Sequence, residues 1–120
     1  MSTAPSSVDM LKRLVAFDTT SRNSNLALIE YVREYLQGHG VASKLVPSDD
    51  GTKANLFATL GEGKPSGIIL SGHTDTVPAQ GNFPGRIEDG WVHGLGATDM
   101  KGGLAVALEL ARDVALGEFA

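Results

Sequence analysis

The sequence predicts an α/β domain in which helices are layered on a sheet. Helical periodicity in residues 7–40, short strand-like runs between residues 42 and 71, and a long apolar helix after residue 100 predict this class. Elements with one apolar face must pack on one another, and helices followed by strands and a buried helix favour a layered arrangement. The 120 residues are enough for one domain and too few for two.

The first helix is predicted by a capping box at Ser6-Ser7-Val8-Asp9, in which side-chain oxygens accept from free backbone N–H groups. Four apolar residues at helical spacing form its expected inner face: Val8, Leu11, Leu14 and Val15. After a polar break at Phe17–Arg22, either Asn23 or Ser24 is expected to cap a second helix that ends near Gly38 and Gly40. Its expected inner stripe is also apolar: Ile29, Val32 and Leu36.

Three runs in the middle of the chain predict strands: Ala42–Val46, Asn55–Leu60 and Gly67–Ser71. The third run is nearly all apolar, which is typical of a strand buried on both faces of a sheet. Residues 78–85 contain prolines and glycines and predict a loop.

A hairpin and a helix complete the predicted elements. Asp89-Gly90 separates Arg86–Glu88 from Trp91–His93, which is a hairpin signature. A helix is expected from about Met100 to Leu116, with one water-facing polar stripe: Glu109, Arg112 and Asp113. Because the rest of that helix is apolar, we expect most of it to be covered.

Composition and charge exclude several functions. The net charge is −4 and no Lys/Arg cluster occurs, which argues against a nucleic-acid partner. Cysteine is absent, so disulfides and thiolate metal sites are excluded, and a metal would be held by His and carboxylates. The longest apolar run, Leu104–Leu108, is too short for a membrane span, and the N-terminus lacks a signal-peptide pattern. We therefore expect a cytoplasmic protein without a membrane partner.

His73 and Asp75 form the first chemical motif, directly after the predicted buried strand. Ligands gather at the carboxyl ends of strands in open α/β sheets, and residues two apart on an extended chain point the same way. A neutral imidazole can bind a metal there while a nearby carboxylate orients it. Taken alone, a His-x-Asp pair is more often a structural hydrogen bond than a metal site.

Asp99 forms the second motif, between a glycine-containing turn at Gly94–Gly96 and the last helix. The glycines allow a backbone geometry that aims the carboxylate at a shared site, and the helix N-terminus stabilises its charge. The structural alternative is that Asp99 or Thr98 only caps the helix. A dinucleotide fingerprint is excluded because Asp99 stands where that motif requires glycine.

Together the two motifs are far more specific. His73-Thr74-Asp75-Thr76-Val77-Pro78 followed by Gly96-Ala97-Thr98-Asp99-Met100-Lys101-Gly102-Gly103 resembles the zinc metallopeptidase family of acetylornithine deacetylase, succinyl-diaminopimelate desuccinylase, carboxypeptidase G and the aminoacylases. The resemblance covers nearly the whole chain. It implies that residues 1–120 are the N-terminal portion of a layered zinc-peptidase-like catalytic domain, without the rest of that domain or a lid domain. Residues 17–25 and 54–59 look most like acetylornithine deacetylase, whereas residues 81–111 look at least as much like the desuccinylases.

The resemblance also implies roles for single residues. His73 would bind one of two zinc ions, Asp75 would support catalysis by steering the ligand cluster, and Asp99 would bridge both metals. Co²⁺ would be a substitute for zinc. The Asp99–Met100 peptide bond is expected to be cis.

The implied activity is hydrolysis of the amide bond of a small N-acyl amino acid. N-acetylornithine is the first candidate, in arginine biosynthesis, and N-succinyl-diaminopimelate is the second; a homodimer is compatible with a longer protein. An alternative of another class is an inactive fragment that binds metal weakly or not at all, because zinc sites use three or four protein ligands.

Several functional residues of the family have no match here. The family places a Glu-Glu pair, its base and a further ligand, well after the bridging Asp, and no such dipeptide occurs in this chain. We therefore expect the isolated chain to be inactive. Of the remaining candidates, His39 is expected to be solvated at a helix end, His93 to lie near the site, and Trp91 to pack in the core.

Overall fold

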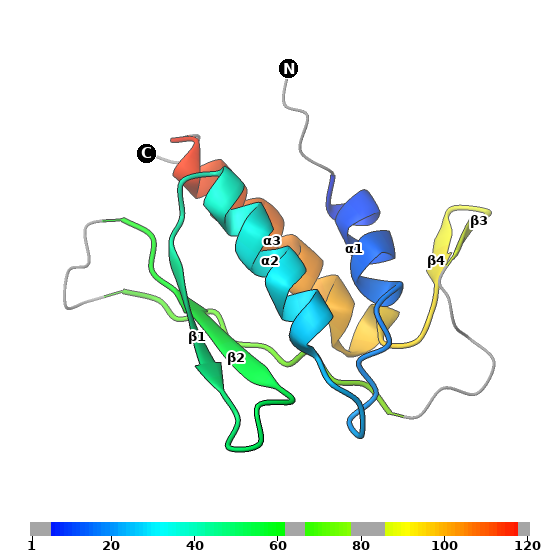
Figure 1. Ribbon diagram of the computed structural model, residues 1–120. Coiled ribbons are helices and arrows are strands. Elements are labelled where there is room, and N and C mark those ends of the chain that lie inside the picture. Colours follow the sequence, from blue (N-terminus) through cyan, green and yellow to red (C-terminus); the bar gives the residue numbers. More distant parts are fainter. Residues whose placement is uncertain (1–5, 62–66, 78–85, 118–120) are drawn as a thin grey trace.

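The computed structural model describes residues 6–61, 67–77 and 86–117. In these ranges it contains three α-helices, a π-type turn and two antiparallel two-stranded sheets (Figure 1). Their bounds are α1 Ser7–Val15, α2 Leu26–Gly38, β1 Ser43–Pro47, β2 Ala54–Ala58, β3 Arg86–Glu88, β4 Trp91–His93, η1 Ala97–Lys101 and α3 Gly102–Ala115. No helix in this part of the chain is long and apolar enough to cross a membrane.

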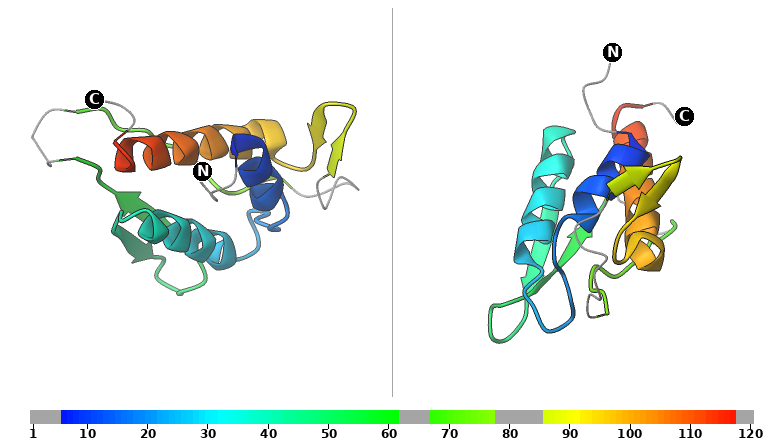
Figure 2. Two further views of the ribbon diagram at one scale, coloured as in Figure 1. Left: turned by 90° about the horizontal axis from the view of Figure 1, so that it is seen from above. Right: turned by 90° about the vertical axis from the view of Figure 1, so that its right-hand side faces the viewer.

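The helices form one group, with α2 and α3 side by side and α1 beside the start of α3 (Figures 1 and 2). The β1–β2 hairpin packs against α2, and the β3–β4 hairpin projects at the other end of the molecule. Helices and small sheets are therefore both present, as the α/β prediction requires. The layered arrangement on a central sheet stays a prediction, because the two described hairpins do not join into one sheet.

The expected buried strand at Gly67–Ser71 is wrong for this structure. Residues 67–71 form no strand, and Ile68, Ile69 and Leu70 are 91%, 82% and 62% exposed. A strand buried on both faces needs neighbouring strands and covering helices. The described residues supply neither to this segment. The predicted loop at 78–85 lies outside the described residues.

The capping prediction for α1 is confirmed, but its inner face is rotated from the expected one. The Ser6 hydroxyl oxygen accepts from the backbone N–H of Asp9 at 3.3 Å, which satisfies one free donor of the first turn. Met10, Leu14 and Val15 are buried, whereas Val8, predicted to face inward, is 49% exposed. The helix places Met10 rather than Val8 against the core.

The expected cap of α2 at Asn23 or Ser24 is wrong, because Asn25 occupies the N-cap position and its side chain makes no capping bond. The Ser24 hydroxyl oxygen accepts from the backbone N–H of Leu26 at 3.1 Å, just before the helix. Of the predicted stripe, Ile29 and Leu36 are buried and Val32 is half-buried. Leu28 is buried as well, so the apolar face of α2 is wider than predicted. This face contacts the hairpin on one side and α3 on the other.

Both hairpins match the sequence predictions closely. In the first, Leu45 pairs with Leu56, and each strand is displaced by one or two residues from its predicted bounds. In the second, Ile87 pairs with Val92 around a tight turn at Asp89 and Gly90. These two residues have φ values of 53° and 80°, which an Asp-Gly pair tolerates well.

The predicted water-facing stripe of helix α3 is wrong for two of its three residues. Arg112 and Asp113, expected to face water, have side chains only 13% and 23% exposed and are ion-paired at 3.2 Å. Apolar residues of the same helix are exposed instead: Val106, Leu110 and Val114. The expected cover over these residues is therefore not supplied by the described part of the chain.

The core is made by apolar side chains from all three helices and the first hairpin. Its buried members are Met10, Leu14, Leu28, Ile29, Leu36, Val41, Ala54, Ala105 and Leu108. Lys101 is also buried, with 1% of its surface exposed. Its Nζ donates to the Phe17 carbonyl oxygen at 2.8 Å, which ties the end of α1 to the start of α3.

Burial lowers the pKa of Lys101 to about 8, and Asp18 opposes this shift by attraction. An unfolded lysine keeps its proton up to about pH 10.4. Between these values the unfolded chain binds more protons than the folded chain, so the free energy of unfolding rises with pH.

We therefore expect Lys101 to make the chain more stable as pH rises from about 8 towards 10, by up to about 3 kcal/mol over the whole window. Urea unfolding of the wild type and Lys101→Met at pH 7.5, 8.5 and 9.5 measures this. The difference in pH slope between the two proteins isolates Lys101 from the other titrating groups. Parallel slopes would contradict the burial of a charged ammonium.

Candidate metal centre

His73 lies between two carboxylates. Its Nε2 is 3.1 Å from Oδ1 of Asp99, and its Nδ1 is 3.1 Å from Oδ1 of Asp75. The Asp75 backbone carbonyl oxygen also lies 3.2 Å from Nδ1. The structure thus brings together the three residues that the two motifs singled out, although their chemical roles stay predictions.

Both ring nitrogens of His73 face carboxylate oxygens. When a carboxylate is ionised, its oxygens accept hydrogen bonds and cannot donate them. A neutral imidazole has one N–H donor and one lone pair. If Nδ1 donates to Asp75, the Nε2 lone pair faces an Asp99 oxygen, and that contact is favourable only with a cation between the two atoms. The arrangement therefore favours a proton or a metal ion at this point.

The spacing of these two atoms fits a shared metal. Zinc binds imidazole nitrogen and carboxylate oxygen at about 2.0–2.2 Å, so two such ligands at angles of 90–109° lie about 2.8–3.6 Å apart. The Nε2–Oδ1 distance of 3.1 Å falls inside this range. Zinc or a similar divalent cation therefore fits between His73 and Asp99.

Asp75 contacts Nδ1, the ring nitrogen of His73 that does not face Asp99. A carboxylate that accepts from the second ring nitrogen fixes the tautomer and the plane of a metal-binding His. The hydrogen bond from the Ser21 hydroxyl holds the pKa of Asp75 below its usual value, which keeps this acceptor ionised.

Asp99 is positioned by the π-type turn η1, not by a helix cap. The Lys101 N–H donates to the Gly96 carbonyl oxygen at 2.8 Å and closes the wide turn. Inside it the Asp99–Met100 peptide bond is cis, which confirms the expectation from the family resemblance. The alternative that Asp99 or Thr98 caps the helix is wrong, because Lys101 occupies the cap position of α3.

Gly96 lets this turn approach the His73 segment. Its φ is 81°, and a Cβ built on it would lie 2.5 Å from Cγ2 of Thr76. Met100 supports the same segment from the other side, since its sulfur lies 3.4 Å from the His73 backbone nitrogen. The two motifs are therefore in direct contact through backbone and side chains.

The site is open and incomplete within the described residues. The side chains of His73 and Asp99 are 49% and 82% exposed. No group of three or more His, Asp or Glu side chains in residues 6–61, 67–77 and 86–117 is placed to hold a metal ion. Two donors are fewer than the three or four of known protein zinc sites.

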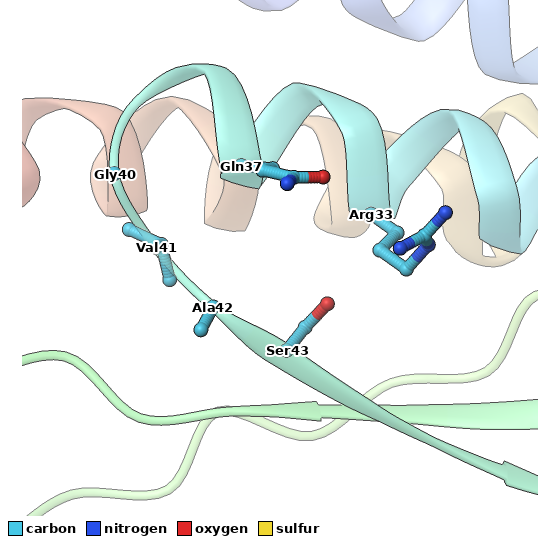
Figure 3. A pocket seen from close by; sticks show the side chains of 6 residues that line it. All are labelled: Arg33, Gln37, Gly40, Val41, Ala42 and Ser43. Atoms are coloured by element: carbon cyan, nitrogen blue, oxygen red, sulfur yellow. The ribbon is translucent and has the colours of Figure 1, made fainter.

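A pocket of about 320 Å³ adjoins Asp99. It is lined by the turn and by neighbouring residues: Thr76, Val77, Val92 and Gly94–Asp99. A second pocket, of about 300 Å³, lies between α2 and β1 and has no acidic or imidazole lining (Figure 3). Ser43 points its hydroxyl into this second pocket, where it has no hydrogen-bond partner among the described residues. The first pocket alone adjoins the predicted site residues.

The remaining candidate residues lie on the β3–β4 hairpin and at the end of α2. Trp91, expected in the core, is 71% exposed on the projecting hairpin, because β3 and β4 have no further strand beside them in the described structure. His93 is exposed on the same hairpin. His39 follows α2 and packs edge-on against Tyr35 with ring centroids 5.0 Å apart. The sequence analysis did not single out Ser21 or Lys101 as site residues. The one indication in the sequence was that they lie within the segments that resemble the family, residues 17–25 and 96–103.

Comparisons with known proteins agree with the motif analysis. Residues 69–117 match Peptidase family M20/M25/M40. A succinyl-diaminopimelate desuccinylase from Rickettsia canadensis is 36% identical over 118 residues, covering 89% of this chain and 30% of the relative. An acetylornithine deacetylase from Proteus mirabilis is 36% identical over 124 residues, covering 92% and 32%.

A second desuccinylase, from Corynebacterium glutamicum, is 50% identical over 54 residues, 45% of this chain and 15% of that relative. The chain thus spans about a third of the length of the relatives that match most of it. Deacetylases and desuccinylases match it about equally well.

We expect Gly96→Ala to destabilise the chain by more than Gly40→Ala. Both glycines have positive φ, 81° and 78°, so alanine costs about 1–2 kcal/mol at either position. Gly40 opens on free space, whereas a Cβ at Gly96 meets Thr76. This overlap adds about 1–3 kcal/mol.

Chemical unfolding of the two variants measures the difference. Equal losses in the free energy of unfolding would show that a Cβ at position 96 does not overlap with Thr76.

Proposed function

We propose that this chain belongs to Peptidase family M20/M25/M40, whose model residues 69–117 match, and that it is part of a metal-dependent amide hydrolase. In this proposal residues 1–120 form the N-terminal portion of a layered zinc-peptidase-like catalytic domain. The rest of that domain, and any lid domain, would be supplied by sequence outside these residues.

One observation carries the proposal: a single imidazole has one nitrogen against a carboxylate that orients it and the other against a carboxylate that can share a metal. A His and an Asp that bind the metal, with a further Asp that accepts a hydrogen bond from the His, are typical of hydrolytic zinc sites. We assign His73 and Asp99 as metal ligands, Asp99 as the bridge between two metals, and Asp75 as the residue that orients His73.

A bound zinc ion would polarise the amide carbonyl and lower the pKa of water to about 7. The chain's own residues prepare the site for it. Asp75 holds the proton of His73 at Nδ1 and leaves Nε2 free to bind. The turn η1 holds the Asp99 carboxylate facing that nitrogen, and the pocket beside Asp99 offers room for part of a small substrate.

The proposed substrate is an N-acyl amino acid. The relatives are named for the removal of a succinyl group from succinyl-diaminopimelate and of an acetyl group from acetylornithine. We propose N-acetylornithine first, which would place the activity in arginine biosynthesis, and N-succinyl-diaminopimelate second. The general base is not assigned to any residue of this chain.

We expect the chain to bind zinc weakly, through His73 and Asp99. His73→Ala and Asp99→Asn should each reduce the affinity more than about tenfold, because each removes a donor from a set of two. His39→Ala is the matched control, since that imidazole lies at the end of α2 against Tyr35. Titration calorimetry with ZnCl₂ provides the affinities. Equal binding by His73→Ala and the control would refute the assignment.

We expect the 120-residue chain not to hydrolyse N-acetylornithine at an enzymatic rate. General-base catalysis typically contributes about 10²–10⁴-fold, and the family's Glu-Glu pair is absent from this sequence. The shortage of donors in the described site also favours the alternative of a non-catalytic fragment with weak metal binding.

The measurement is ornithine release in the presence of zinc, against a metal-only blank. If the chain turned over substrate faster than the blank, and His73→Ala abolished this turnover, the general base would have to lie within this chain.

A further inference from the structure

The polar segment after α1, residues 17–25, is hydrogen-bonded to residues 74–76, which directly follow His73. The Thr76 N–H donates to the Thr19 carbonyl oxygen at 3.0 Å, and the Ser21 N–H donates to the Thr76 carbonyl oxygen at 3.0 Å. These bonds form an isolated parallel bridge between Thr20 and Thr76. The Thr19 hydroxyl adds a bond to the Thr74 carbonyl oxygen at 2.5 Å.

The same pairing places the Ser21 hydroxyl on Asp75. Ser21 Oγ donates to Oδ2 of Asp75 at 2.5 Å, while Oδ1 of the same carboxylate faces Nδ1 of His73 at 3.1 Å. The terminal torsion of an Asp side chain is broad, so an unanchored carboxylate samples a wide range of angles. A bond that holds Oδ2 therefore also fixes the direction in which Oδ1 meets the imidazole.

Ser21 is itself held in place from several sides. Its N–H bonds to Thr76, and its carbonyl oxygen accepts from the Lys53 ammonium. Asp18 accepts from the Thr20 N–H at 3.1 Å and from the Thr20 hydroxyl at 2.7 Å, which closes the turn before Ser21. Ser21 therefore acts as a fixed donor, although its side chain lies at the surface.

We infer that Ser21 is a positioning residue for the metal centre, holding Asp75 so that the His73 imidazole presents Nε2 toward Asp99. As a statement about metal binding, this inference rests on the proposed function. Its direct physical consequence does not, because the hydrogen-bond chain from Ser21 through Asp75 to His73 exists without a metal. The two consequences are therefore measured separately.

The first measurement uses the metal-free 120-residue chain. Imidazole ¹⁵N chemical shifts of His73 distinguish a protonated Nδ1 from a protonated Nε2 and so report the share of the Nδ1–H tautomer. Ser21→Ala should lower that share, because a freed Asp75 carboxylate no longer favours Nδ1–H over Nε2–H. Ser21→Thr, which keeps the hydroxyl, should restore it.

Ser48→Ala is the matched control. Ser48 Oγ donates to Oδ1 of Asp50 at 2.8 Å in an exposed turn, so this variant removes the same type of bond at a carboxylate other than the two that contact His73. It should leave the His73 shifts unchanged. Unchanged shifts in Ser21→Ala, or equal changes in Ser21→Ala and Ser48→Ala, would overturn the inference whether or not the chain binds zinc.

The second measurement is zinc affinity in a double-mutant cycle. Ser21→Ala alone should raise the zinc dissociation constant about tenfold, the low end of the range for residues that orient metal ligands. In an Asp75→Ala background the same substitution should have a much smaller effect, because the hydrogen-bond chain from Ser21 through Asp75 to His73 is gone and the Ser21 hydroxyl keeps only its longer contact with the Thr76 carbonyl oxygen, at 3.3 Å. Additive losses in the cycle would overturn the inference. Absence of zinc binding by the wild type would instead contradict the proposed function and leave the tautomer result to decide the role of Ser21.

Discussion

The geometry of the site depends on the pairing of Thr19–Ser21 with Thr74–Thr76. These segments are 55 residues apart in sequence, and their backbone and side-chain bonds supply the main polar link between them. Thr19, Thr20 and Thr76 are buried, so their polar groups must find partners within the protein. The Thr76 N–H bonds to the Thr19 carbonyl oxygen, the Thr19 hydroxyl to the Thr74 carbonyl oxygen, and the Thr20 N–H and hydroxyl to Asp18. The pairing aligns the stretch that carries His73 and at the same time delivers a hydroxyl to Asp75.

Features set by neighbouring residues were predictable from the sequence. Asp89-Gly90 specifies a tight turn by its own backbone preferences, and Ser6 caps α1 with an atom three residues from its donor. The motif around Asp99 predicted the cis bond through family resemblance alone. In each case the determining contacts lie within a few residues of the signal.

Most features that depend on contacts between residues distant in sequence were not predictable from the sequence. The apolar pattern of Gly67–Ser71 and of α3 predicted burial, but burial depends on what lies opposite, and the described residues place nothing over Ile68 or Val106. In the sequence, Ser21 is one serine within a polar break. Its contact with Asp75 could not be predicted, because Asp75 lies 54 residues away. The convergence of His73 with Asp99 followed from two motifs considered together, whereas the ring nitrogen that each carboxylate contacts required coordinates.

The buried tie from Lys101 to Phe17 has a consequence for which sequences this site tolerates. The ammonium of this buried side chain donates to one carbonyl oxygen, that of Phe17, at 2.8 Å. Arginine keeps the charge but brings a broad planar group with five donors, and methionine keeps the stem but loses the donor. A replacement at this position must therefore match the length, the width and the donor number of lysine together.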